Sequence, residues 1–141
     1  MIRQIAHVCY FTDQLERMID FYEGKLGLKV KFTLADKEGE AFGYYFECGH
    51  STFLEIFDQT LAVKEWGGEV GSFGRAHYQH LCFEVTGLDS FCRRLKAQGV
   101  VATDIAVGLD SSRQAWIKDP DGNPIELMEY TADSLQLKGR A

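Results

Sequence analysis

Hydrophobic and polar residues alternate at the start of the chain, which is typical of a β-strand with two different faces. Over residues 4–11, one of these faces carries Ile5, His7, Cys9 and Phe11. Apolar residues then recur at the spacing of an amphipathic helix, at Leu15, Met18, Ile19 and Tyr22. Thr12 or Asp13 is expected to cap this helix. Three further strands are predicted near residues 28–34, 41–48 and 51–57.

The second half of the chain repeats this order. A strand is predicted over about 78–85 and a helix over about 88–98, capped by Thr86 or Asp89. Three strands follow near 101–107, 113–118 and 124–130, and Asp119-Pro-Asp-Gly forms a turn before the last one. The pattern therefore predicts an α+β fold of two tandem β-α-β-β-β modules.

These modules divide the chain into four segments. Module 1 covers about 3–57, a linker 58–77, module 2 about 78–130, and a polar tail 131–141. The linker is long for a compact domain, which favours a functional or interfacial role, and a helical turn is expected around 61–66. The tail is expected to be loose. At 141 residues, we expect the two modules to share one domain.

The repeat carries chemistry as well as structure. His7-Val-Cys-Tyr returns 73 residues later as His80-Leu-Cys-Phe, and Glu55 has its counterpart 71 residues later in Glu126. Strand parity places each His and each Glu on a face that can line a cup. A carboxylate inside an apolar strand is costly to bury unless it is paired or bound to a metal. Two imidazoles and two carboxylates suit a borderline divalent ion such as Zn, Ni, Co, Mn or Fe.

Other side chains share these faces and are candidates for contact with a substrate. They are Phe11, Phe53, Phe57, Glu84 and Met128. Gln59, at the start of the linker, is a further candidate through the family resemblance described below. Cys9 and Cys82 share the faces of the two histidines, where small core thiols are the favoured interpretation over metal ligands. Trp66, Arg75 and Tyr130 are candidates either for substrate contact or for an interface or surface role.

Composition and charge limit the classes of partner that we expect for this chain. The net charge is −6 and no block of Lys or Arg occurs, which argues against nucleic acid and anionic membranes. No apolar run is long enough to span a bilayer, and the N-terminus has no signal-peptide layout. The four cysteines include no Cys-x-x-Cys pair, so we expect reduced thiols and a cytoplasmic protein.

Four stretches occur in a distinctive order along the chain: Ile5-Ala-His7-Val, Phe21-Tyr-Glu-Gly-Lys-Leu-Gly27, His80-Leu-Cys-Phe and Asp119-Pro-Asp-Gly-Asn-Pro-Ile-Glu126-Leu. With them, about residues 3–130 resemble the vicinal oxygen chelate superfamily of glyoxalase, bleomycin resistance and extradiol dioxygenase proteins. The resemblance implies a curved half-barrel sheet around one divalent metal ion. His7, Glu55, His80 and Glu126 fall at the ligand positions of a bacterial-type glyoxalase I.

This resemblance implies a lyase or isomerase that transfers a proton through a metal-stabilised enediolate of a small 2-oxoaldehyde–thiol adduct or a similar substrate. Glu126 is the expected base and Glu55 the expected proton carrier on the other side. Relatives often pair as dimers, which implies a homodimer whose sites lie within one chain or are shared between two. The sequence does not fix the metal, the substrate or the thiol.

Two positions depart from the glyoxalase I pattern. Phe11 stands where that family carries an Arg that holds a glutathione carboxylate, and Gln59 stands in place of its Asn. Three rivals therefore remain open: an epimerase or isomerase of a non-thiol substrate, a dioxygenase or thiol transferase, and a binding protein like the bleomycin-resistance members.

Overall fold

The computed structural model describes residues 5, 7–50, 52–69 and 80–138. The chain divides into two compact units, Met1–His77 and Tyr78–Ala141. The linker beyond residue 69 and the part of the predicted strand 78–85 before His80 lie outside the described residues. Among the helices of the described residues, none has the length and apolar character needed to span a membrane.

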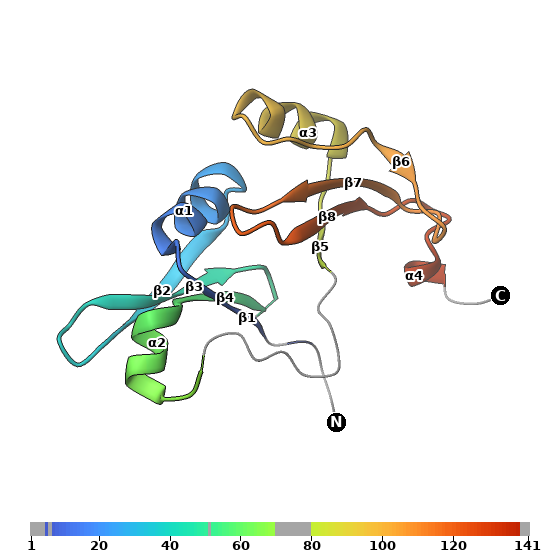
Figure 1. Ribbon diagram of the computed structural model, residues 1–141. Helices are drawn as coiled ribbons and strands as arrows, with labels where there is room; N and C mark the ends of the chain where they lie inside the picture. The colour runs from blue at the N-terminus through green and yellow to red at the C-terminus, as the bar shows by residue number, and fades with distance from the viewer. Residues whose placement is uncertain (1–4, 6, 51, 70–79, 139–141) are drawn as a thin grey trace. The chain divides into compact units, whose positions relative to one another are not determined.

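The first unit contains one β-α-β-β-β module and a following helix (Figure 1). Its elements are β1 (His7–Thr12), α1 (Leu15–Ile19), a π-helical turn η1 (Asp20–Lys25), β2 (Lys29–Ala35), β3 (Ala41–Glu47), β4 (Phe53–Asp58) and α2 (Gln59–Trp66). The sheet order is β1-β4-β3-β2, with β1 parallel to β4 and the other neighbours antiparallel. The predicted order is confirmed, and the expected turn around 61–66 is a full helix, α2.

The core of this unit lies between the helical segment and one face of the sheet. Met18 and Tyr22, from the predicted helical stripe, are fully buried, as are Phe46 and Ile56 from the strands. The predicted cap is wrong in detail. The residue before α1 is Gln14, whose side chain makes no cap bond, while the Thr12 hydroxyl accepts a hydrogen bond from the Gln14 backbone N–H at 3.1 Å.

The second unit repeats the module. Its elements are β5 (Leu81–Glu84), α3 (Leu88–Ala97), β6 (Ala106–Val107), β7 (Arg113–Lys118), β8 (Pro124–Glu129) and a short α4 (Leu135–Lys138). The sheet order is β5-β8-β7-β6, with β5 parallel to β8. Leu88, Leu95, Ile125 and Leu127 are buried where α3 packs on the sheet. Both modules thus have the same topology, as the repeat predicts.

Two details of the second unit differ from expectation. The strand expected over 101–107 is only Ala106–Val107, because the Thr103 hydroxyl accepts the Trp116 backbone N–H at 2.9 Å in place of a regular ladder. Neither Thr86 nor Asp89 caps α3. Instead Glu129, a residue of β8, accepts hydrogen bonds from the Gly87 and Leu88 backbone at 2.6 and 3.3 Å.

The described part of the tail, residues 131–138, is also better ordered than expected. Ser134 is fully buried and its hydroxyl accepts a hydrogen bond from Ser112 at 2.8 Å. The Leu135 backbone N–H donates to the Asp110 carbonyl at 2.8 Å. These bonds hold the start of α4 against the loop before β7.

Candidate metal and substrate site

The first unit brings the predicted ligands His7 and Glu55 together. They come from the parallel neighbours β1 and β4, and the register sets Cys9 directly opposite Glu55. His7 Nδ1 lies 3.2 Å from Glu55 Oε1, and the Glu55 side chain is only 10% exposed. A carboxylate this buried needs a partner, and the imidazole supplies one.

Two further side chains surround this carboxylate. Burial, the negative charge of Glu55 and a hydrogen bond to it raise the pKa of the Cys9 thiol to about 11. Burial and the Glu55 charge also raise the pKa of Tyr45, which lies opposite Glu55 on β3. Both groups therefore stay protonated at neutral pH and can donate to the carboxylate.

The second unit builds the same pair from the same positions. His80 Nε2 lies 3.3 Å from Glu126 Oε2, whose side chain is 12% exposed. Cys82 stands opposite Glu126 on β5, and burial followed by the charge of Glu126 raises its pKa to about 12. Trp116 takes the place of Tyr45, with its ring packed edge-on against the His80 ring at 4.9 Å.

The donor atoms of each pair fit a shared metal ion. Two donors about 2.1 Å from one ion lie roughly 3.0–3.4 Å apart at octahedral to tetrahedral angles. The two N···O separations fall in this range. Across the described part of the chain, no group of three or more His, Cys, Asp or Glu side chains gathers at one point. The four predicted ligands are therefore present as two pairs, one in each unit, and their union in one site stays a prediction.

The predicted substrate residues lie on both units. In the first, Phe11 is 46% exposed and contacts buried Phe57 with 6.1 Å between ring centres. Phe53 stands opposite His7 in the ladder, and Gln59 opens α2. In the second unit, exposed Glu84 stands opposite buried Met128.

Sequence reasoning missed several neighbours of these residues. Tyr45 and Trp116 could have been found, because each occupies the position of its strand that the antiparallel register sets beside a predicted ligand. Gln136 could not, because it reaches Met128 Sδ (3.8 Å) only through the fold of the tail.

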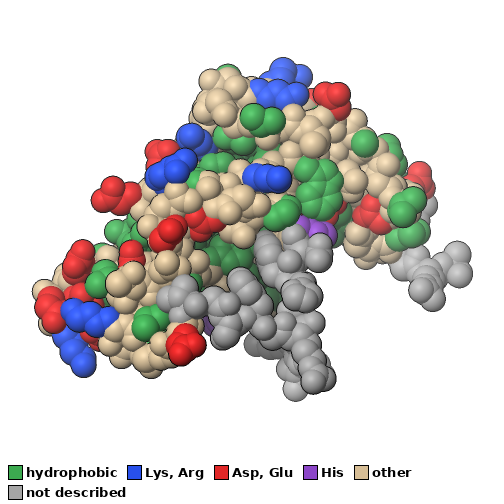
Figure 2. All heavy atoms as spheres, viewed as in Figure 1, with side chains coloured by type: hydrophobic (Ala, Val, Ile, Leu, Met, Phe, Trp, Pro, Cys, Tyr) green, Lys and Arg blue, Asp and Glu red, His purple; other side chains and the backbone are tan. Residues whose placement is uncertain are grey.

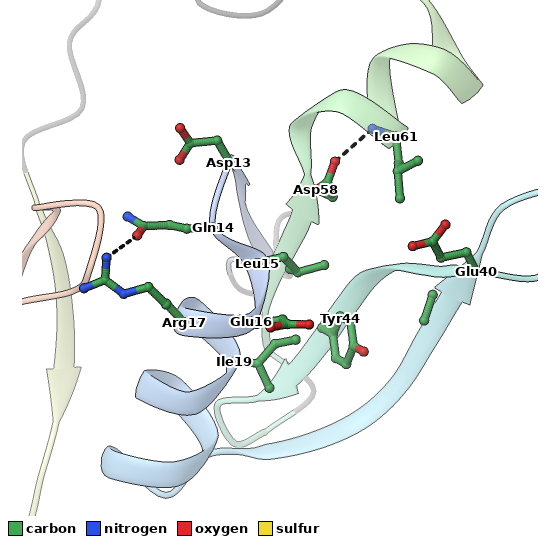
Figure 3. A pocket seen from close by; sticks show the side chains of 11 residues that line it. Asp13, Gln14, Leu15, Glu16, Arg17, Ile19, Glu40, Tyr44, Asp58 and Leu61 are labelled. Atoms are coloured by element: carbon green, nitrogen blue, oxygen red, sulfur yellow. Dashed lines mark hydrogen bonds between the residues drawn. The ribbon is translucent and has the colours of Figure 1, made fainter.

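A separate pocket of about 470 Å³ opens beside the start of α1 (Figure 3). Its walls come from α1, β3 and the start of α2, and none of the predicted site residues lines it. Asp58 at its rim accepts hydrogen bonds from the Thr60 and Leu61 backbone at 2.9 Å, so this carboxylate is engaged as the cap of α2. Figure 2 shows acidic and basic side chains interspersed on the face in view, without a basic patch there.

Comparisons with known proteins point to one family. A sequence model of the Glyoxalase/Bleomycin resistance protein/Dioxygenase superfamily matches residues 4–127. A lactoylglutathione lyase of Neisseria meningitidis serogroup A is 30% identical over 131 residues, covering 89% of this chain and 90% of the relative. A lactoylglutathione lyase of Salmonella typhimurium is 30% identical over 128 residues, covering 89% and 92%. The crystal structure of a glyoxalase family protein from Enterococcus faecalis is 26% identical with a TM-score of 0.67, covering 90% of this chain and 98% of its own.

Proposed function

Since this chain belongs to the Glyoxalase/Bleomycin resistance protein/Dioxygenase superfamily, we propose that it is a divalent-metal-dependent lyase or isomerase of the glyoxalase I type. The observation that carries the proposal is the duplicated pair. Each repeat holds one imidazole 3.2 or 3.3 Å from one nearly buried carboxylate, at the same position of the same kind of sheet. The lactoylglutathione lyases among the relatives support an enzyme rather than a binding protein.

His7, Glu55, His80 and Glu126 are the residues that would hold the ion. A divalent ion held by them supplies a Lewis acid, which polarises a substrate carbonyl and acidifies the neighbouring C–H. Glu126 is the proposed base: its carboxylate, whose side chain is 12% exposed and lies 3.3 Å from His80, takes this proton on an oxygen. Glu55 takes the hydroxyl proton of the adduct and returns it to the neighbouring carbon, while Glu126 gives the proton it took to the other substrate oxygen, so both carboxylates end as they began. The Cys9 and Cys82 thiols hold the two carboxylates in position by donating to them.

The substrate is a small molecule, and a 2-oxoaldehyde–thiol adduct is the first candidate. Phe11 favours a second candidate, an epimerase or isomerase of a non-thiol substrate. An exposed phenylalanine cannot hold the carboxylate that a basic residue at this position would bind. A homodimer and a cytoplasmic location stay predictions, which sedimentation and cell fractionation test.

Glu126→Gln tests the role of the base. Glutamine keeps an oxygen donor but cannot accept the proton, so we expect most of the metal to stay bound and turnover to fall about 10²–10⁴-fold. Glu47→Gln is the matched control, since Glu47 is an exposed strand residue that pairs with Lys31 at 3.1 Å. Metal content is measured by elemental analysis of both variants beside turnover. Full activity of Glu126→Gln would end its assignment as base.

Methylglyoxal with and without glutathione separates the two candidates. Thiol-dependent turnover supports glyoxalase I chemistry. Absence of thiol-dependent turnover with each of Zn, Ni, Co, Mn and Fe would remove glyoxalase I. A chain that binds no metal would remove the metal-dependent enzyme altogether, because an imidazole–carboxylate hydrogen bond can also give these N···O distances.

A further inference from the structure

We propose that Phe11, Phe42, Phe57 and Trp66, called here the aromatic cluster, form the subsite for an aryl or similarly flat, uncharged group of the substrate. This inference rests on the proposed function, because it takes the His7–Glu55 pair as the place where the oxygens of the substrate bind. It adds the substrate class, which neither the ligand pairs nor the relatives specify.

The aromatic cluster has a buried floor and an exposed surface. Phe42 and Phe57 are 3% and 1% exposed, whereas Phe11 and Trp66 are 46% and 56% exposed. The Trp66 ring lies 4.9 Å from Phe57, 5.3 Å from Phe42 and 6.3 Å from Phe11. These are the separations at which aromatic rings attract one another, and a further ring can add to such a group in the same way.

The local structure is built to hold these rings in place. Gly43 stands opposite Phe57 in the ladder, and a Cβ at Gly43 would lie 2.1 Å from a Phe57 ring carbon. Only glycine therefore lets the Phe57 ring lie flat across β3. Asp58 caps α2 through two backbone hydrogen bonds of 2.9 Å, so the helix that ends at Trp66 begins directly after β4. The buried Ala62 of α2 packs against Phe42 and Phe57 and fixes the helix there.

The position of the aromatic cluster relative to His7 and Glu55 indicates which part of the substrate would bind there. Phe11 and Phe57 are partners in the β1–β4 ladder, two residues along from the partners Cys9 and Glu55. Residues i and i+2 point to the same face and lie roughly 7 Å apart. A ring bonded next to an oxygen-bearing carbon spans this step, with its oxygens toward His7 and Glu55 and its flat face on Phe11 and Trp66.

The ion pairing of two lysines of this unit favours an uncharged substrate group at the aromatic cluster. Lys64 of α2 already pairs with Glu38 at 3.1 Å, and Lys31 of β2 pairs with Glu47 at 3.1 Å. Each of these two lysines is therefore already engaged by a carboxylate. A free carboxylate placed on the rings would lose its hydration without gaining either of them.

Mandelate and lactate test the subsite directly. Both are 2-hydroxy acids with the same charge and the same two vicinal oxygens, and they differ only in a phenyl or a methyl group. Titration calorimetry on the zinc-loaded full chain should give about tenfold tighter binding of mandelate, from the extra apolar area buried. Phe11→Ala and Trp66→Ala should each bring this ratio close to one.

Phe32→Ala is the matched control. Phe32 is 45% exposed, as Phe11 is, but its ring stacks on Tyr45 at 4.1 Å. The variant should keep the mandelate preference. Circular dichroism of each variant checks that the fold is kept, and Trp66→Phe, which retains a ring, should keep most of the preference.

The outcomes separate the two proposals. Equal binding of mandelate and lactate, or binding of neither, overturns the subsite whether or not metal is bound. A mandelate preference in a chain that binds no metal overturns the proposed function and supports the subsite. Tighter binding of phenyltrimethylammonium than of mandelate would mark a cation site and overturn the proposal. The proposal would also be overturned if Trp66→Ala dissociated a dimer of this chain without changing the mandelate preference.

Turnover then decides which part of the substrate carries the ring. Phenylglyoxal with glutathione places it on the carbonyl part, and methylglyoxal with benzyl mercaptan places it on the thiol part. Whichever of these two pairs turns over faster than methylglyoxal with glutathione shows whether the carbonyl part or the thiol part of the substrate carries the ring. If the chain turns over methylglyoxal with glutathione but neither aryl pair is faster, the aromatic cluster does not act on the reacting substrate, and the subsite proposal fails; if it turns over none of the three pairs, the proposed function fails and the mandelate-to-lactate ratio alone decides the subsite.

Discussion

Gly43→Ala places a new Cβ of β3 against the Phe57 ring, so it tests how the sheet supports the proposed substrate subsite. The new Cβ would lie 2.1 and 2.5 Å from two carbons of the Phe57 ring, whereas carbon atoms in contact lie about 3.5–4.0 Å apart. The ring cannot simply swing away, because it is 1% exposed and packs on Phe42 and Trp66. Overpacking of this kind costs about 1–3 kcal/mol.

The expected loss of stability is near the middle of that range. Replacing a strand glycine by alanine recovers about 0.5–1 kcal/mol of chain entropy, so a steric cost of about 3 kcal/mol leaves roughly 2 kcal/mol. For a chain of this size, this corresponds to a fall of roughly 4–8 °C in Tm. Urea unfolding followed by circular dichroism measures the loss. The near-ultraviolet signal should fall as well, because the ring contacts of Phe57 change.

A double-mutant cycle isolates the clash. In a Phe57→Leu background the side chain is smaller, so adding Gly43→Ala should cost less than about 0.5 kcal/mol. The coupling between the two positions is then about 1.5 kcal/mol. Equal cost of Gly43→Ala in both backgrounds would refute the reasoning, because the loss would then come from the backbone rather than from the ring.

Three further predictions concern the elements that hold the two units. Asp58→Ala removes the cap of α2 and should lower the free energy of unfolding by about 1 kcal/mol in urea titration, whereas Asp58→Ser should restore most of it. Glu129→Gln leaves an acceptor for the start of α3 but removes the ion pair with Arg113 (2.7 Å), so we expect a loss of about 1 kcal/mol in the same assay, and no loss would contradict a stabilising role of this ion pair. A hydrogen bond from Arg113 lowers the pKa of the Asp89 carboxyl below 3.8. The stabilising effect of this hydrogen bond should therefore be complete above pH 3.8 and be lost as the pH falls through the lowered pKa. Asp89→Asn should therefore be less stable than the parent chain at pH 6, with the difference closing toward pH 2 in thermal unfolding, and a difference independent of pH would contradict this assignment.

The repeated topology could be predicted because its signals are local. Strand alternation and helical spacing are read within ten residues, and they place His7 with Cys9 and Phe11 on one face before any pairing is known. The duplication added one His and one Glu in each half whose strand parity lets them face one cup, and the family resemblance named these four residues as ligands. The structure confirms that each His lies beside its own Glu within its unit.

The details that could not be predicted depend on contacts between distant residues. Glu129 caps a helix that begins 41 residues earlier in the chain, which no local capping motif reveals. The opposition of Gly43 and Phe57 requires the register of β3 on β4. Trp66 joins the aromatic cluster only because α2 turns back onto the sheet directly after Asp58. In each case the sequence supplies the residue type, and the partner is set by tertiary pairing.

The duplicated sheet separates two tasks that a single strand pair would have to combine. A pair of residues that stand opposite each other in a strand ladder is called a rung here. In both units one rung sets a thiol opposite a carboxylate: Cys9 opposite Glu55, and Cys82 opposite Glu126. The rung two residues further differs, since Phe11 faces Phe57 in one unit whereas Glu84 faces Met128 in the other. Successive rungs on one face lie roughly 7 Å apart, so a change at the outer rung leaves the donor atoms of the inner rung in place. If the two proposals hold, substrate choice can therefore be altered at Phe11 without altering the proposed ligand pair of His7 and Glu55. For this reason the mandelate-to-lactate ratio, rather than metal content, is the measurement that Phe11→Ala should change.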